Sequence, residues 1–460
     1  VGYQALKANT CGNYNTAVGS YAMQANTTGG QHTAVGNGAQ AANTTGSYNT
    51  AVGYRAAYST TSGAYNVAVG RCALGGNTTG VVNTAVGYSA GMSNTTGHNN
   101  TSVGEGANSA KDGSLYTVAV GNCANQAAGS ACNVVAIGPG ALRCNTGGHR
   151  NVGVGISALC NTTTGCNNTA IGEKALTKNT TGCFNTASGY YALFCNTTST
   201  QNTAVGGCSL FANTTGAGNT AVGFSALKCN TTGKFNQALG VSALLCNQTG
   251  CCNVAVGTNA MYANCTGNQN VAVGDDALCY NRAGSLNVGM GQESLAQNTT
   301  GNQNTGVGYG SLCKTTSGSY NTAVGSVALL FNTTGTHNVA MGRYALYCNG
   351  TGVGSTALGH SALQCNTVSN NTSIGNNSLC ANTTGACLVA VGINALRKNT
   401  TGVRNVGVGS FALYANTTGN FNTASGYMAL YNNTTGCDNV ATGFCAMHIS
   451  TTGSNNVAIG

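Results

Sequence analysis

The side chains that could perform chemistry are few in this chain, and the acidic ones are the scarcest. Seven Asp and Glu residues occur among 460, and Asp275 and Asp276 form the only adjacent pair. Hydrolysis of a polysaccharide uses two carboxyl groups that flank one glycosidic bond, whereas adjacent residues of a strand point to opposite faces. We therefore expect no enzyme and no catalytic residue. A polysaccharide-acting enzyme on a β-helix is a weaker alternative.

Metal-ligating residue types are more plentiful, but they are not arranged as ligand sets. The six histidines are scattered along the chain, and no Cys-x-x-Cys pair occurs among the 23 cysteines. Zinc sites are recognised by such closely spaced ligands. The sequence accordingly predicts no metal site and no cofactor.

The cysteines favour disulfide chemistry instead. Many of them flank a recurrent Asn-Thr-Thr-Gly motif, and disulfides are typical of oxidising, extracellular settings. Small apolar filler in a reducing cell is the alternative. Since 23 is an odd number, at least one thiol stays free or pairs between chains. The candidate pairs are Cys160/Cys166 and Cys246/Cys251 within one repeat, Cys132/Cys144 and Cys183/Cys195 between adjacent repeats, and Cys229/Cys246 and Cys348/Cys365 at equivalent places in adjacent repeats.

The same motif supplies many Asn-x-Thr acceptors for N-linked glycans. Covalent glycans would hydrate a chain in which only 5% of the residues are charged. The alternative is turn chemistry, in which Asn and Thr bind local backbone groups and Gly adopts a positive φ. The candidate acceptors are Asn26, Asn43, Asn77, Asn94, Asn161, Asn179, Asn196, Asn213, Asn230, Asn247, Asn264, Asn298, Asn332, Asn349, Asn382, Asn399, Asn416 and Asn433.

These residues recur because the whole chain is one tandem repeat. Twenty-eight glycines that end an Ala-Val-Gly-like triplet, from Gly2 to Gly460, follow one another every 17 residues, except that Gly375 comes 16 residues after Gly359. We number each repeat from this glycine as position 0. The consensus is then Gly-x-x-Ala-Leu-x-x-Asn-Thr-Thr-Gly-x-x-Asn-[Thr/Val]-Ala-Val. A register this strict predicts one coil of a stacked structure for each repeat.

The pattern predicts an all-β fold, a parallel β-solenoid or β-roll of about 27 coils. Positions 14 and 16 are β-branched or apolar and share one face of a short strand. We expect strands near positions 13–16 and 2–6, with position 16 and the Leu at position 4 filling a thin core. Stacking at about 4.8 Å per coil would give an elongated rod on the order of 130 Å long.

We expect a single continuous solenoid over residues 1–460, cut from a longer repetitive fibre, since the chain opens and stops inside the pattern. The coils over residues 36–138 are predicted to be weaker. Position 4 loses its large apolar side chain there, and a solenoid is stabilised coil by coil. The deviating residues are Gln40, Ala57, Gly91, Asn108 and Asn125.

Position 13 is Asn in 22 of the 27 coils. It is usually followed by Thr-Ala or Val-Ala, which makes no glycan acceptor. Stacked asparagines bond to one another along a column through their amides. We therefore predict an asparagine ladder with Asn15, Asn49, Asn202, Asn219 and Asn321 among its members.

Two segments, Asn253-Val-Ala-Val-Gly-Thr-Asn-Ala-Met and Asn456-Val-Ala-Ile-Gly, resemble the head repeats of trimeric autotransporter adhesins. The pattern is also similar to the Asn-Thr-Ala-x-Gly-Tyr repeats of tail-fibre-like proteins of phages and large viruses. The resemblance implies a left-handed parallel β-roll, a homotrimer and a place on a bacterial or virion surface. It brings no catalytic residue with it.

We expect a rigid extracellular fibre or adhesin-type shaft, at a cell or virion surface, with glycans along one edge. Its partners would be copies of itself, laterally or end to end, and a carbohydrate or cell-surface receptor bound by tyrosines such as Tyr190, Tyr191 and Tyr427. The net charge of +9 is spread along the chain, which disfavours nucleic-acid binding. No apolar run reaches the ~20 residues of a membrane span.

Two alternative functions share this architecture. One is a phage or viral tail-fibre shaft. The other is an ice-binding solenoid, in which stacked Thr at positions 8 and 9 would form a flat hydroxyl array. That array is interrupted at Lys111, Ala128, Gly147, Arg282 and Val368.

Overall fold

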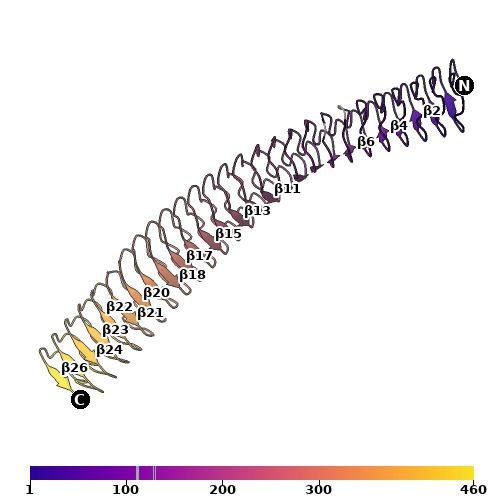
Figure 1. Cartoon of the computed structure of the whole chain (residues 1–460). Helices are drawn as coiled ribbons and strands as arrows, with labels where there is room; N and C mark the ends of the chain where they lie inside the picture. Colours follow the sequence, from indigo (N-terminus) through magenta and orange to yellow (C-terminus); the bar gives the residue numbers. More distant parts are fainter. Residues whose placement is uncertain (110–112, 128, 130) are drawn as a thin grey trace. The chain divides into compact units, whose positions relative to one another are not determined.

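A computed structural model describes residues 1–109, 113–127, 129 and 131–460. These residues form an all-β parallel β-solenoid and contain no helix, which confirms the fold predicted from the repeat. Each repeat makes one coil, and each coil contains one three-residue strand at positions 14–16 (Figure 1).

The chain divides into two units, Val1–Thr232 and Gly233–Gly460, which we call the N-terminal and the C-terminal unit. The single continuous solenoid over 1–460 stays a prediction. The N-terminal unit holds β1 (Thr16–Val18), β2 (Thr33–Val35), β3 (Thr50–Val52), β4 (Val67–Val69), β5 (Thr84–Val86), β6 (Thr101–Val103), β7 (Val118–Val120), β8 (Val135–Ile137), β9 (Val152–Val154), β10 (Thr169–Ile171), β11 (Thr186–Ser188), β12 (Thr203–Val205) and β13 (Thr220–Val222). The C-terminal unit holds β14 (Gln237–Leu239), β15 (Val254–Val256), β16 (Val271–Val273), β17 (Val288–Met290), β18 (Thr305–Val307), β19 (Thr322–Val324), β20 (Val339–Met341), β21 (Thr356–Leu358), β22 (Thr372–Ile374), β23 (Val389–Val391), β24 (Val406–Val408), β25 (Thr423–Ser425), β26 (Val440–Thr442) and β27 (Val457–Ile459).

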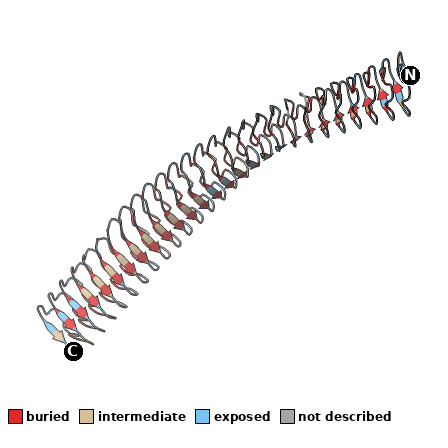
Figure 2. Ribbon diagram, in the orientation of Figure 1, coloured by how far each residue is buried: buried red, intermediate tan, exposed pale blue. Residues whose placement is uncertain are grey.

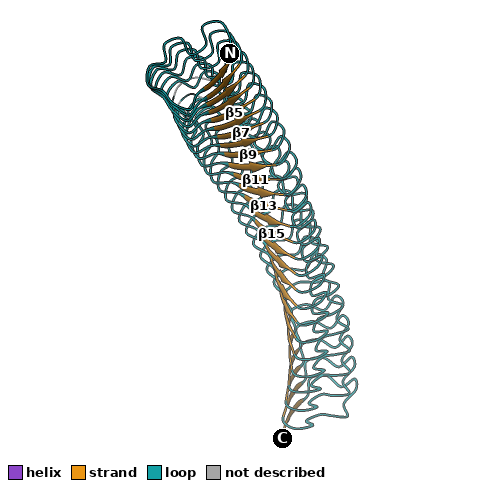
Figure 3. Ribbon diagram, turned by 90° about the vertical axis from the view of Figure 1, so that its right-hand side faces the viewer, coloured by secondary structure: helices purple, strands orange, loops and turns teal. Residues whose placement is uncertain are grey.

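Within each unit, consecutive strands pair in parallel and in register, so that equivalent residues stack as columns. Thr16 pairs with Thr33, for example. The 16-residue coil keeps this register, since Thr356 pairs with Thr372. The lost residue therefore falls in the turns, where a deletion breaks no strand pairing. Figure 3 shows the strands along one side of the coils and the turns that complete each circuit.

Positions 2–6 form turns, so the prediction of a second strand there is wrong. The residues at positions 2 and 4 have positive φ, such as 60° at Tyr21 and 51° at Met23, which is uncommon for residues with a side chain. Their backbone groups still bond to neighbouring coils. The N–H of Tyr21 donates to Tyr3 O at 2.8 Å, and the N–H of Met23 donates to Ala39 O at 2.9 Å. These bonds hold the left-handed residues in place and turn the chain back on itself.

The core of each coil consists of the small residue at position 15, the Ala or Ser at position 3 and the Leu at position 4. Ala170 and Leu176, for instance, are fully buried, and Figure 2 shows buried residues along the strands. Position 16 points outward instead, and Ile171 is 47% exposed. The prediction that position 16 fills the core is therefore wrong. The interior of the coil has room for only a small side chain from the strand. A Cβ on Gly153 at position 15 would already lie 3.4 Å from Leu142 Cδ1.

The glycine at position 0 is required by the stacking of the coils. At Gly172 φ is +131°, and a Cβ there would lie 2.6 Å from Gly189 O in the next coil. A side chain would be strained by this φ and would also collide with the backbone. The regular recurrence of this glycine along the chain therefore has a steric cause.

The coils over residues 36–138 bury polar side chains at position 4. Asn125 Nδ2 donates to Asn108 Oδ1 at 3.1 Å, but Asn108 Nδ2, Asn125 Oδ1 and Gln40 Oε1 have no hydrogen-bond partner among the described residues. Each such group destabilises a fold by about 1–3 kcal/mol, which fits a weaker segment. The segment includes residues 110–112, 128 and 130, which lie outside the described residues, so its weakness stays a prediction.

Candidate functional site

The Asn-x-Thr asparagines at position 7 line a column inside the coils. Asn264 Nδ2 donates to Gly267 O at position 10 of its own coil, at 3.1 Å, and to Asn247 Oδ1 one coil earlier, at 2.8 Å. A glycan would occupy the nitrogen that makes these bonds. Seventeen of the eighteen candidate acceptors are at most 2% exposed. They are Asn26, Asn43, Asn77, Asn94, Asn179, Asn196, Asn213, Asn230, Asn247, Asn264, Asn298, Asn332, Asn349, Asn382, Asn399, Asn416 and Asn433.

Asn161 differs from the other candidate acceptors. It stands at position 6 and its side chain is exposed, while Thr162 takes the buried position 7. Burial therefore argues against glycans on the seventeen interior asparagines of the folded chain, and against a sugar-coated edge. Glycosylation of Asn161, within Asn161-Thr162-Thr163, stays a prediction.

The asparagines at position 13 form a second column. The backbone N–H and the Nδ2 of Asn202 both donate to Asn185 Oδ1 one coil earlier, at 3.1 and 3.2 Å. The other predicted ladder members also bond to an adjacent coil: Asn15 Nδ2 to Gly29 O at 2.9 Å, Asn49 Nδ2 to Gly63 O at 2.8 Å, Asn219 N–H to Asn202 Oδ1 at 3.0 Å and Asn321 Nδ2 to Gly335 O at 2.8 Å.

The two asparagine columns converge on the carbonyl at position 10. Gly29 O accepts from Asn15 at position 13 and from Asn26 at position 7, both at 2.9 Å. The turn after Asn-Thr-Thr-Gly is thus fixed by amides of two coils. The predicted ladder covered only position 13. The missed signal was that position 7 is as regular as position 13.

His32 replaces the position-13 asparagine in one coil and is 2% exposed. Its Nε2 lies 2.6 Å from Gly46 O, and its Nδ1 accepts the N–H of Asn49 at 3.2 Å. A neutral imidazole with its proton on Nε2 makes both bonds. Burial lowers the pKa of His32 below its ordinary value of 6.5, and the two backbone bonds oppose this only in part.

Stability should consequently fall as the pH drops below about 6.5, because the unfolded chain protonates His32 more readily than the folded chain does. His32→Asn restores the consensus residue and should remove this part of the pH dependence. Thermal unfolding of both proteins at about pH 7.5 and about pH 5 measures the effect. An identical loss of melting temperature in both proteins would contradict the assignment.

The threonines at position 8 use their hydroxyls within the protein. Thr27 Oγ1 donates to Thr44 O at 2.9 Å, and Thr299 Oγ1 donates to Thr316 O at 2.9 Å. Position 9 is exposed, as at Thr28. One of the two hydroxyl columns of the ice-binding alternative is therefore engaged by backbone rather than available to water.

The described residues contain no disulfide. Cys348 and Cys365, a predicted pair, hydrogen-bond to each other through their side chains. Elsewhere the structure brings together cysteines of adjacent coils other than the predicted pairs. The N–H of Cys166 donates to Cys183 Sγ at 3.1 Å, and the side chain of Cys160 bonds to that of Cys144. Disulfides that involve Cys132, Cys195, Cys229, Cys246 and Cys251 stay predictions.

The carboxylates of the adjacent residues Asp275 and Asp276 lie near the thiol of Cys279 rather than near a second pair of carboxylates. Asp276 hydrogen-bonds to Cys279, and burial together with this charge raises the pKa of Cys279 to about 12. That thiol stays protonated near neutral pH and is a poor nucleophile. In the described ranges no group of three or more His, Cys, Asp or Glu side chains could hold a metal ion. Nor is any helix of the described part long and apolar enough to cross a bilayer.

The tyrosines predicted to bind carbohydrate lie largely against other rings. Tyr414 and Tyr431 stack with centroids 5.0 Å apart and an angle of 7°, and His448 continues the stack at 5.1 Å and 12°. Tyr427 stacks on Phe444 in the same way. Tyr190 and Tyr191 meet edge to face, with centroids 4.4 Å apart. Open ring surface remains, since Tyr190 is 54% and Tyr427 42% exposed. Carbohydrate binding by these residues stays a prediction.

The outward side of the strands is a regular surface. We call positions 14 and 16 of each strand the outward sheet face. Neither column contains a charged residue. Position 14 is Thr or Val, apart from Gln237, and position 16 is apolar in all but three coils. The exposed apolar members of position 16 are Val18, Val52, Val69, Val86, Ile137, Ile171, Val205, Leu239, Met290, Met341, Ile374, Val408 and Ile459.

Comparison with known proteins adds no relative: no protein-family model matches the chain, and no curated protein matches its sequence. The resemblance to adhesin heads and tail fibres therefore stays a prediction.

Proposed function

We propose that this chain is a structural shaft that assembles laterally with copies of itself through the outward sheet face. The observation that supports this is the exposed apolar column at position 16, repeated in coil after coil. Contiguous exposed apolar surface of this kind marks interaction sites. A repetitive β-solenoid, rigidly bonded between coils, suits a shaft.

A second copy is the partner that fits this face best. Its own outward sheet face has the same two uncharged columns at the same spacing of about 4.8 Å. Apolar residues of one chain can therefore pack against those of another along the whole of a unit. A closed assembly of two or three chains, the homotrimer included, would cover every such face.

We further propose a non-catalytic role outside the cell or at a cell or virion surface. Support for the location comes from the resemblance of Asn253-Val-Ala-Val-Gly to surface-fibre repeats. Support for the absence of catalysis comes from the spread of only seven acidic residues over 460. Adhesion to a receptor would be a property added to the shaft.

Lysine at three exposed sites of the C-terminal unit should dissociate the assembly. Met290, Met341 and Val408 are each at least 40% exposed, so Met290→Lys, Met341→Lys and Val408→Lys leave the coil interior unchanged. Their charges would be desolvated in an assembly. Light scattering should give a multiple of 45.6 kDa for the wild-type chain and 45.6 kDa for the triple variant.

The matched control places the same three charges on exposed turn threonines, as Thr300→Lys, Thr334→Lys and Thr418→Lys. This variant should keep the wild-type mass. A wild-type chain of 45.6 kDa at micromolar concentration would sink the proposal. If that monomer also showed thermal hysteresis, the ice-binding alternative would take its place.

A further inference from the structure

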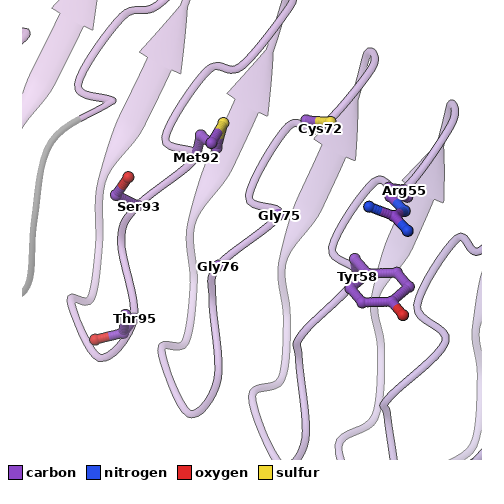
Figure 4. A pocket seen from close by; sticks show the side chains of 8 residues that line it. All are labelled: Arg55, Tyr58, Cys72, Gly75, Gly76, Met92, Ser93 and Thr95. Atoms are coloured by element: carbon purple, nitrogen blue, oxygen red, sulfur yellow. The ribbon is translucent and has the colours of Figure 1, made fainter.

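A hollow in the N-terminal unit opens where one coil lacks two side chains. The hollow measures about 670 Å³, large enough for a small organic molecule. Figure 4 shows its walls on successive coils. The lining residues are Arg55, Tyr58, Cys72, Gly75, Gly76, Met92, Ser93 and Thr95.

The hollow exists because the position-5 column loses one rung. Tyr58, Gly75 and Met92 occupy position 5 in three successive coils, so the middle one contributes no side chain. The backbone does not close the gap. The N–H of Ser59 donates to Gly75 O at 3.0 Å, and the N–H of Gly76 donates to Met92 O at 2.7 Å. The coils thus keep their spacing of about 4.8 Å, which leaves room for a flat group between Tyr58 and Met92.

Position 5 accepts stacked rings elsewhere in the chain. Tyr414 and Tyr431, at position 5 of successive coils, stack at 5.0 Å. A planar aromatic ring at the missing rung would contact Tyr58 on one side and the thioether of Met92 on the other. Both contacts are favourable, the first as an aromatic–aromatic contact and the second by sulfur–aromatic attraction.

The charge beside the hollow is positive. The Arg55 guanidinium lies 5.0 Å from the centre of the Tyr58 ring and 5.5 Å from that of Tyr54. Arg71 in the next coil lies 5.8 Å from the Tyr54 ring centre. The one ion pair found among the described residues joins Lys174 and Glu173. Both arginines are thus held over ring faces with their charges available to an anion.

We propose that this hollow binds a planar aromatic anion. Its ring lies between Tyr58 and Met92, and its carboxylate or sulfonate lies at Arg55, which is suited to bidentate contact with such groups. Ser93 also lines the hollow and offers a hydroxyl to a further polar substituent. This binding site is independent of the outward sheet face.

The test uses the full chain and the fluorescent aromatic sulfonate 8-anilinonaphthalene-1-sulfonate. The chain contains no Trp, so the probe signal is free of indole energy transfer. Gly75→Tyr supplies the missing rung and should weaken probe binding at least about tenfold. Gly75 has no positive φ, and position 5 carries a side chain in the neighbouring coils. Leu330→Tyr, at position 5 of a coil in the other unit, is the matched control and should bind as wild type does.

Arg55→Gln separates charge from shape, and it tests the site even if Gly75→Tyr folds poorly. It should weaken the sulfonate about tenfold while the neutral probe N-phenyl-1-naphthylamine binds within about twofold of wild type. Circular dichroism and melting curves must match wild type, because loosened folds also bind the sulfonate probe. A folded Gly75→Tyr variant with unchanged probe binding would overturn the proposal, as would an Arg55→Gln variant that loses both probes equally.

Discussion

Asn264→Ala should destabilise the C-terminal unit by about 3 kcal/mol, because it removes a buried amide from the middle of a column. Asn264 Nδ2 donates to Gly267 O and to Asn247 Oδ1, and Asn264 Oδ1 accepts from Asn281 Nδ2 at 2.8 Å. The substitution leaves buried polar groups of two neighbouring coils without this partner. Denaturant unfolding followed by circular dichroism measures the free energy of unfolding.

Asn161→Ala is the matched control, since it removes the same amide from an exposed Asn-x-Thr site. It should change the free energy of unfolding by less than about 0.5 kcal/mol. Equal effects of Asn161→Ala and Asn264→Ala would show that position 7 is not an interior column.

Gly172→Ala should have an effect of similar size in the N-terminal unit, about 3 kcal/mol or more. The added Cβ would lie 2.6 Å from Gly189 O, and the φ of +131° disfavours any side chain. Both effects act on the junction between two coils, where a solenoid derives much of its stability. A lower melting temperature and faster proteolysis at this coil are the expected results.

Gly207→Ala provides the comparison for this second substitution. Gly207 stands at position 1, has no positive φ, and its Cβ would meet only the edge of the Phe224 ring at 3.3 Å. The change should leave the melting temperature within a few degrees of wild type. If Gly172→Ala were as mild as Gly207→Ala, the steric explanation of the 17-residue spacing would fail.

The spacing of the glycines was enough to predict the fold, because only stacked coils place identical residues one above another for the length of a chain. It was harder to predict which face of the strand points to the core. Alternation shows that Thr169 and Ile171 share one side, but it does not say which side is inside. The volume of Leu176 decides that, and a volume balance needs the path of the chain. The large apolar residue at position 16 was therefore assigned to the core, whereas the structure places the small residue at position 15 there.

The turn at positions 2–6 could not be predicted from residue types either, because its conformation also depends on neighbouring coils. Residues such as Tyr21, Met23 and Leu176 have no local preference for positive φ, and bonds to neighbouring coils impose it. The asparagines at position 7 satisfied the rule for glycan acceptors and the rule for turn residues equally well. Their burial depends on a carbonyl ten positions after the glycine, which the sequence alone does not place.

The in-register stacking of equivalent residues also bears on how such a gene can change. Deletion or duplication of one whole 17-residue segment preserves every column, because the flanking coils then meet residues at equivalent positions. Recombination between similar repeats therefore lengthens or shortens a unit without altering its cross-section. The 16-residue coil between Gly359 and Gly375 keeps its strand pairing, so a change of one residue is tolerated when it falls in a turn.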